Sequence, residues 1–148
     1  MVSKTNIALG TDESEHFSIS ALEYFGDDSG WCGFLTMRSG SFALIDHKFY
    51  FDDLLDFRDR IRSIYKELRG TATLRTRYEN DCLEVTATTR GHITVKGHFE
   101  TFTPEINRID LEFVLDQTFL PALISSLDQA IEETQSESGE VTGDNAPS

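Results

Sequence analysis

The sequence predicts an α+β fold, in which one antiparallel β-sheet carries two α-helices on one of its faces within a single domain. Most of the chain alternates apolar and polar residues with a period of two, which is typical of strands with one buried face. Two segments instead repeat their apolar residues every three or four positions, as amphipathic helices do. Each segment directly follows an aromatic-rich strand, so the expected order is strands, helix, strands, helix.

The first half of the chain contains the first expected helix, after several strands. "HFSISALEYF" alternates and then shifts its pattern at Leu22, which indicates a β-bulge. "WCGFLTMRSGSFALIDHKFYF" indicates two strands joined by a turn at 39–40. The second of these strands is expected to place on one face Ala43, Ile45, His47, Phe49 and Phe51. Helical spacing from Leu54 to Leu68 then predicts a helix, with Asp53 as its N-cap and Gly70 as its left-handed stop.

The second half repeats this plan. Four expected strands are "TATLRTRY", "CLEVTATT", "HITVKGHFETF" and "INRIDLEFVL". A second helix is expected from about Gln117 to Glu133, with Pro121 in its first turn, where a missing N–H costs little. Thr118 or a neighbouring residue is expected to cap this helix.

The two strand-to-helix junctions resemble each other. Aligning Asp52 with Asp116 also sets Phe49 over Phe113 and Asp46 over Asp110. Two explanations stay open: a diverged internal duplication, or the general preference of such junctions for Asp as a cap beside apolar residues. The predicted organisation is one α+β domain over residues 1–132 and an acidic disordered tail over residues 133–148.

The charge of the chain limits its partners. The formal net charge is −13, and five acidic residues with no Lys or Arg follow from Glu132 onward. Such a chain repels nucleic acid and anionic membranes, and it favours a basic protein partner or simple solubility. The sequence shows no signal peptide and no apolar stretch long enough to span a membrane, so we expect a cytoplasmic protein. It does not indicate an oligomeric state.

The candidate catalytic and metal-binding residues each fail a test of spacing. His47 lies on an apolar face, which favours a satisfied core histidine, while His92 and His98 are about 20 Å apart along one strand. Asp110 and Glu112 alternate on a solvated strand, and Cys32 has no cation or helix start beside it. No nucleotide, serine-hydrolase or zinc-protease motif is present. We therefore expect no catalytic residues, no metal and no cofactor.

One face of the predicted sheet concentrates positive charge within this acidic chain. It is expected to face solvent and to contain Arg75, Arg77, Arg90, His92, Lys96 and His98. Such a face is most often simply solvated, and its functional interpretation is a surface for binding a protein partner. Because it has few aromatic residues, the stacking of bases seen in RNA-binding sheets is not expected.

The chain also resembles a known family. The spacing of Trp31 and Gly33, the Phe-rich strand before a helix, "GHITVKG" and "LEFVLDQTFLPALISSL" are similar to small bacterial immunity proteins of the WapI type, over roughly residues 17–131. The resemblance implies an α+β protein without catalytic residues that neutralises a toxin, or one that is encoded in such a locus with an undefined role. Two functional hypotheses follow: a non-enzymatic interaction protein that binds a toxin domain, or a small enzyme or ligand-binding domain with a cleft between helix and sheet.

Overall fold

The chain folds into two four-stranded antiparallel sheets and two helices. The computed structural model describes residues 2–11, 14–26, 30–77, 80–102 and 104–145, with side chains described as far as residue 135. In chain order the elements are β1 (Ile7–Gly10), β2 (Glu15–Tyr24), β3 (Trp31–Ser39), β4 (Phe42–Phe51), α1 (Leu54–Glu67), β5 (Thr71–Arg75), β6 (Cys82–Ala87), η1 (Thr89–Gly91), β7 (His92–Phe102), β8 (Ile106–Asp116), η2 (Gln117–Phe119) and α2 (Leu120–Asn145). The predicted α+β class is confirmed. The prediction of a single sheet was wrong, because the strands divide between two sheets, β1-β2-β3-β4 and β5-β6-β7-β8.

Both halves of the chain follow the same order of elements. Each half is a meander of four antiparallel strands followed by a helix, so strands that are neighbours in the chain are also neighbours in the sheet. The two aromatic residues that align at the junctions, Phe49 and Phe113, are both buried. The predicted alternation of strands and helix is therefore present, with four strands in each half.

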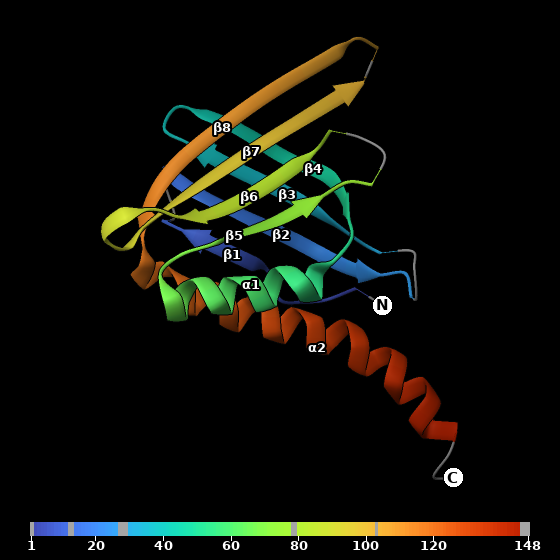
Figure 1. Ribbon diagram of the computed structural model, residues 1–148. Helices are drawn as coiled ribbons and strands as arrows, with labels where there is room; N and C mark the ends of the chain where they lie inside the picture. The colour runs from blue at the N-terminus through green and yellow to red at the C-terminus, as the bar shows by residue number, and fades with distance from the viewer. Residues whose placement is uncertain (1, 12–13, 27–29, 78–79, 103, 146–148) are drawn as a thin grey trace.

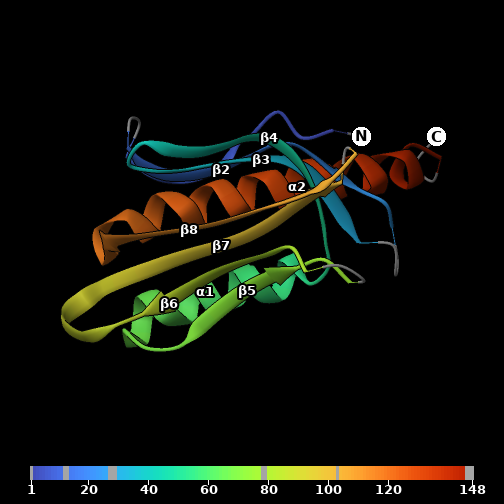
Figure 2. The ribbon, with the colours of Figure 1, turned by 90° about the horizontal axis from the view of Figure 1, so that it is seen from above.

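Each helix packs against the sheet of the other half. Helix α1 contacts β5 and β6, whereas α2 contacts β1 and β2, and the two helices also contact each other. Figure 1 shows the helices side by side below the strands, and Figure 2 shows the two sheets as separate layers. This exchange joins the two halves into one core, because neither sheet buries its apolar face with its own helix.

The hydrophobic core lies between the two sheets and the two helices. It contains the inward side chains of both sheets, with Phe17, Phe49, Phe57 and Phe99 among its largest fully buried members. The second sheet approaches the first closely at Gly97, where a Cβ atom would lie 2.5 Å from Sδ of Met37. Glycine is needed here because a side chain would force the two layers apart.

Two β-bulges change which side chains face the core. The predicted bulge in β2 is confirmed, because Ala21 has a φ of 53° and the pairing with β3 shifts between Ser20 and Glu23. A second bulge in β4 places Asp46 at a φ of 51°. The prediction that Ile45 shares the face of Phe49 was therefore wrong: Leu44 pairs with buried Met37, and Ile45 is exposed.

The helix ends differ from the prediction in detail. Asp53 takes the N-cap position of α1, but its backbone is left-handed and its side chain makes no capping hydrogen bond. The residue that ends α1 with a left-handed backbone is Leu68, two positions before the predicted Gly70. Asp116, not Thr118, caps the second helical segment, since its carboxylate accepts a 2.9 Å hydrogen bond from the Thr118 N–H. Pro121 lies in the first turn of α2, as predicted.

Glu133 anchors the N-terminal segment to α2. Its carboxylate accepts hydrogen bonds from the side chains of Ser3 (2.8 Å) and Thr5 (2.7 Å) and from the N–H groups of Lys4 (2.9 Å) and Thr5 (3.1 Å). The next residue, Thr134, is buried. Both residues fall in the predicted tail of residues 133–148, yet they contact the folded part of the chain. Helix α2 continues to Asn145, and the tail side chains from 136 onward lie outside the described residues.

Removing a large core side chain from either helix should destabilise the domain. Phe57 and Leu123 are fully buried, so replacement of each by Ala is expected to lower the free energy of unfolding by about 2–5 kcal/mol. Urea denaturation measures this loss. Tyr65→Ala on α1 is the matched control, because Tyr65 is exposed and its loss should change stability little. Near-neutral results for both core variants would contradict the packing described here.

The Glu133 anchor should make stability depend on acid pH. Hydrogen bonds from Thr5, Ser3 and the backbone lower the pKa of Glu133 from 4.5 to about 2. A lowered pKa stabilises the fold above pH 4.5, and this contribution is lost as the pH falls from 4.5 to 2. Glu133→Gln should therefore unfold at lower urea than the wild type at pH 6, with the difference shrinking toward pH 2. Glu132→Gln removes the same charge from an exposed neighbour and serves as the control.

Candidate partner-binding surface

The six residues of the predicted binding face do not form one patch. Arg75, Lys96 and His98 lie close together on the outer face of β5–β7, where Cys82 pairs with both Arg75 and His98. Arg77 lies beyond the end of β5 and pairs with Asp52. At the opposite end of the sheet, Arg90 lies in the turn η1 and His92 begins β7. The structure brings three of the six together.

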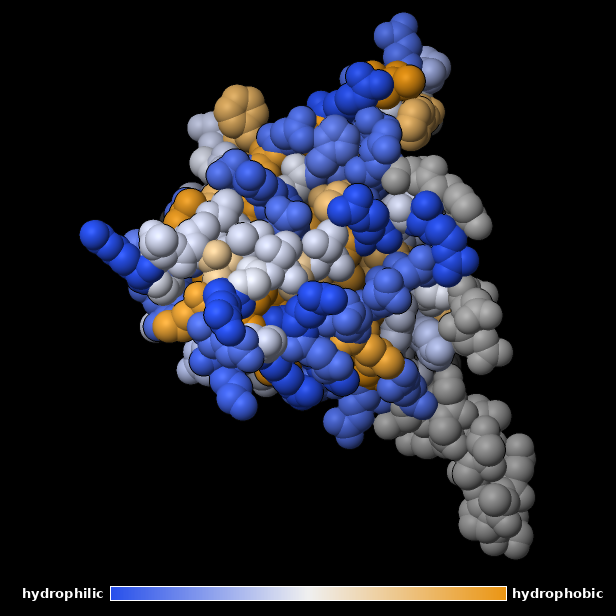
Figure 3. All heavy atoms as spheres, in the orientation of Figure 1, coloured by the Kyte–Doolittle hydropathy of each residue, from blue (hydrophilic) through white to orange (hydrophobic). Residues whose placement is uncertain are grey.

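Acidic side chains alternate with the cations on this outer face. Lys96 is paired in register with Glu84 on one side and Glu112 on the other, and His98 is paired with Asp110. Opposite charges on neighbouring strands stabilise a sheet by local pairing. Figure 3 shows this side of the molecule as largely hydrophilic. The face is therefore balanced in charge, in contrast to the positive surface that was predicted.

His98 belongs to a network of ion pairs at the edge of this face. Its Nδ1 lies 2.6 Å from Asp110 and its Nε2 lies 3.4 Å from Glu100, which also accepts a 2.8 Å hydrogen bond from Arg108. The hydrogen bond with Asp110 raises the pKa of His98, and the hydrogen bond from Arg108 lowers the pKa of Glu100. Cys82 lies beside His98 in the register, but burial raises the pKa of its thiol, and both imidazole nitrogens of His98 face carboxylates, those of Asp110 and Glu100. Cys82 and His98 therefore do not form the pair of activated thiol and free base that a nucleophile requires.

His47 joins the two sheets through Asp81. The Nε2 atom of His47 on β4 lies 2.7 Å from Oδ2 of Asp81, which precedes β6 and is only 3% exposed. The other oxygen of Asp81 accepts a 2.9 Å hydrogen bond from the Glu100 N–H. The ring of His47 also meets the ring of Phe99 at 5.4 Å. His47 is thus a satisfied histidine at the inner face, as its position in the sequence predicted, and Asp81 was not predicted as its partner.

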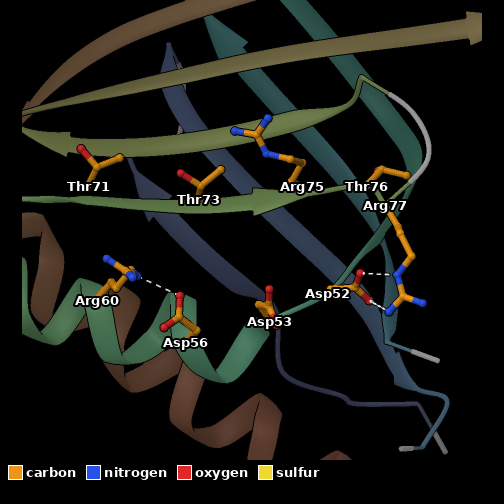
Figure 4. A pocket seen from close by; sticks show the side chains of 9 residues that line it. All are labelled: Asp52, Asp53, Asp56, Arg60, Thr71, Thr73, Arg75, Thr76 and Arg77. Atoms are coloured by element: carbon orange, nitrogen blue, oxygen red, sulfur yellow. Dashed lines mark hydrogen bonds and ion pairs between the residues drawn. The ribbon is translucent and has the colours of Figure 1, made fainter. Parts of the chain in front are cut away.

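A cleft opens between the start of α1 and β5. It consists of two adjoining cavities of about 510 and 540 Å³, which share Asp52, Asp53, Asp56 and Arg77. Figure 4 shows the first cavity, with Arg77 joined to Asp52. This pair has two hydrogen bonds, of 2.8 and 3.0 Å. The alternative hypothesis from the sequence expected a ligand-binding cleft between helix and sheet. This cleft is in that position.

The carboxylates of the cleft differ in their pairing. Asp52 is bound by Arg77, and Asp56 is bound by Arg60 at 2.8 Å. The carboxylate of Asp53 makes no hydrogen bond or ion pair with any residue that the structure describes. Figure 4 shows it pointing from the start of α1 toward β5. The cleft therefore contains one carboxylate, that of Asp53, with no partner among the residues that the structure describes.

Aromatic side chains are exposed on the outer face of the first sheet. Phe25, Phe34 and Tyr50 are 44%, 39% and 47% exposed, and the rings of Phe25 and Tyr50 stack with centroids 6.5 Å apart. Phe34 pairs in register with Lys48, whose ammonium group lies 5.4 Å from the Tyr50 ring. We call Phe25, Phe34, Lys48 and Tyr50 the aromatic face. Helix α2 and the second sheet contact this sheet on its other side, so the aromatic face keeps a large part of its ring surface in contact with solvent.

The sequence contained a signal for the aromatic face. Phe34 alternates with Leu35 in β3, so one of the two must point outward, and Tyr50 alternates in the same way with Phe49 and Phe51 in β4. The prediction followed charged residues and overlooked large aromatic residues at outward positions.

Two kinds of site are not found in the described part of the chain. No group of three or more His, Cys, Asp or Glu side chains is arranged there to hold a metal ion. No helix within those residues is long and apolar enough to cross a membrane.

The structure is thus an α+β protein with two four-stranded sheets, each of which has an outer face that the helices leave uncovered. The chain matches the model of the immunity protein WapI-like family over residues 8–135, and it belongs to this family. The family resemblance predicted from the sequence is confirmed. The match includes Glu133 and Thr134, in agreement with their contacts in the fold. No curated protein and no solved structure matches the chain.

Loss of the Asp81 carboxylate should destabilise the junction between the sheets. Asp81→Ala leaves the buried N–H of Glu100 and the ring of His47 without their acceptor, which is expected to cost about 1–3 kcal/mol. Asp110→Ala is the matched control, because it also removes a histidine partner but at an exposed position, where the expected loss is at most about 1 kcal/mol. Urea denaturation compares the two, and equal losses would contradict a structural role for Asp81.

Proposed function

We propose that this protein neutralises a toxin by binding it, without catalysing a reaction. The observation that carries the proposal is the aromatic face, in a chain that belongs to an immunity protein family. Exposed aromatic side chains supply much of the binding energy at protein interfaces once they are desolvated by a partner. A monomeric protein with no partner gains nothing from keeping three such rings in water.

The competing hypothesis is an enzyme or a ligand-binding domain that uses the cleft. It requires groups that are free to accept or donate protons in the cleft or near it. Arg77 and Arg60 each bind a neighbouring aspartate there, and His47 and His98 lie outside the cleft in pairs of their own. Asp53 remains as the one carboxylate of the cleft without a partner among the described residues, and a single carboxylate does not make an acid–base pair. The pairings of the other groups therefore support the binding function.

A protein partner fits this chain better than nucleic acid or a membrane does. The net charge of −13 opposes contact with phosphate groups, and the same charge speeds the approach of a basic protein. The surface of Arg75, Arg77, Arg90, His92, Lys96 and His98 stays a second candidate for the contact. We favour the aromatic face because three of its four side chains are aromatic and a large part of each ring is exposed.

The test of this function is neutralisation of a toxin domain, which we would look for first among the products of the neighbouring genes. Phe34→Ala and Tyr50→Ala are expected to weaken neutralisation by at least about tenfold, as anchor residues of an interface do. Phe42→Ala is the matched control, because Phe42 is 69% exposed at the β3–β4 turn, away from the aromatic face. His47→Gln, Cys32→Ala and Asp110→Asn should reduce neutralisation only in proportion to lost stability, which the melting curve measures.

Stoichiometry separates binding from catalysis in the same experiment. Binding predicts that neutralisation requires about one molecule of this protein for each molecule of toxin. Full neutralisation at a small fraction of the toxin concentration would contradict the proposal and favour an enzyme. The same conclusion follows if a fully folded His47→Gln, Cys32→Ala or Asp110→Asn variant loses all activity while Phe34→Ala keeps it.

A further inference from the structure

Strand β5 has an unpaired edge. It is the outermost strand of the second sheet and pairs with β6 in a register without a bulge. The N–H of Thr76 binds the carbonyl oxygen of Asp81 at 3.1 Å, and bonded positions alternate along an antiparallel pair, so the even-numbered residues of β5 are those bonded to β6. The backbone N–H and C=O groups of Thr71, Thr73 and Arg75 therefore point away from β6. They have no hydrogen-bond partner among the residues that the structure describes.

The other three sheet edges have features that oppose pairing with a further strand. Helix α2 lies along β1, and the N–H of Ala8 binds Oγ of Ser126 there at 3.2 Å. The edge strand β4 contains the bulge at Asp46, and the edge strand β8 carries charged side chains, with the carbonyl oxygen of Glu112 bound by Oγ of Ser39. Bulges, charges and covering elements are the usual protection of an edge. Within the described chain β5 has no bulge, no proline and no bond across its edge, so it is the edge most open to another strand.

A groove runs along this edge, between β5 and α1. It is the first cavity of the cleft, of about 510 Å³, and Figure 4 shows the outward side chains of β5 on one side and the first half of α1 on the other. The free groups from Thr71 to Arg75 extend over about 13 Å, which is the length of about four to five residues of an extended chain. The groove is lined by three aspartates and three arginines, so it is balanced in charge. Main-chain hydrogen bonding is therefore the recognition that this groove offers.

We propose that the edge of β5 takes up an extended segment of the toxin as a fifth strand of the second sheet, in the groove beside α1. The inference rests on the proposed function and adds a second contact to the aromatic face. The alternating donors and acceptors of a sheet edge are complementary to an extended main chain, and strand addition gains its affinity from these bonds. The end of β5 lies beside β4, since Oγ1 of Thr76 donates a 2.6 Å hydrogen bond to the carbonyl oxygen of Tyr50. The two contacts are thus on neighbouring strands of the fold.

A second copy of this chain is a poorer occupant of the edge. The β5 strands of two copies can pair in principle, but each copy has a formal charge of −13, so two copies repel. A toxin segment is not subject to this repulsion between identical chains. The charge of the chain therefore favours the toxin as the source of the added strand.

Amide hydrogen exchange, followed by NMR at single residues, tests the added strand in the wild-type protein. In the free protein the N–H groups of Thr71, Thr73 and Arg75 should exchange quickly, whereas those of Ala72 and Leu74 are bonded to β6 and should exchange slowly. In the complex with the toxin domain, exchange of the first three is expected to slow by at least about tenfold. Exchange that is unchanged by the toxin at these three positions would overturn the inference.

The variant Thr73→Pro removes the central donor of the edge. The N–H of Thr73 points away from β6, so its loss breaks no hydrogen bond of the free protein, and proline is tolerated on edge strands at such positions. Thr73→Val is the matched control, because it keeps the N–H and a β-branched side chain. We expect Thr73→Pro to weaken binding of the toxin domain by at least about tenfold and Thr73→Val by less than about twofold. Melting curves check that both variants are folded, and the exchange experiment does not depend on either variant.

A synthetic peptide of alternating Thr and Val tests the edge without the toxin. At millimolar concentration it is expected to shift the amide signals of Thr71, Thr73 and Arg75 in a saturable way. The same peptide with every amide N-methylated cannot donate hydrogen bonds and should leave these signals unchanged. The shifts should be lost in Thr73→Pro and kept in Thr73→Val. A peptide that shifts none of the three signals would contradict an edge that accepts a strand.

The outcomes separate this inference from the proposed function. If the wild type neutralises the toxin through Phe34 and Tyr50, but Thr73→Pro binds normally and the three edge amides stay unprotected, strand addition is wrong and the proposed function stands. Slow exchange of these amides in the protein alone, together with a dimeric mass, would assign the edge to a second copy and overturn the inference. If the wild type binds no toxin, the proposed function fails, and the assignment of the added strand to a toxin fails with it.

Discussion

The exchange of helices between the two sheets is the constraint on which the rest of the structure depends. Each sheet has one apolar face, and the helix that buries part of it comes from the other half of the chain. Both halves must therefore fold together, and the inward faces of both sheets are used up in forming the core. Contact with another molecule is left to the outer faces, the helix surfaces and the cleft at the start of α1.

The outer faces of the two sheets differ in composition, since one is charged and the other is largely aromatic. On the second sheet, cations and acids alternate across the strands and satisfy one another, so little is gained by covering them. On the first sheet, Phe34 and Tyr50 leave a large part of their rings exposed to solvent within the aromatic face. Membership of the immunity protein family implies a protein partner in general, and our proposal assigns the aromatic face to that contact.

Much of the fold could be predicted from the sequence, because periodicity reports directly on burial. The helix beginning at Leu54 and the bulge near Leu22 both followed from the spacing of apolar residues. The bulge at Asp46 could not be predicted in this way: Ile45 and Leu44 are both apolar, and only the pairing with Met37 decides which one is buried. The division into two sheets was equally hidden, since it depends on close contacts such as that of Gly97 with Met37, between residues far apart in the chain.

The candidate site was harder to predict than the fold. Lys96 and His98 were predicted from the sequence to belong to a positively charged face. Their acidic neighbours Glu112 and Asp110 lie on the next strand, and only the strand register shows that they are adjacent. The cleft joins β4, α1 and β5, so the unpaired state of Asp53 is a property of the folded chain alone.

Side-chain footprinting of the complex with the toxin domain tests the central claim most directly, because hydroxyl radicals label aromatic rings according to their exposure. In the free protein, Phe34, Tyr50 and the hairpin-tip residue Phe102 are all exposed enough to react. Docking on the aromatic face predicts that Phe34 and Tyr50 are protected in the complex while Phe102 reacts as before. Protection of Phe102 or of Val114 on β8, with Phe34 and Tyr50 still fully reactive, would contradict it.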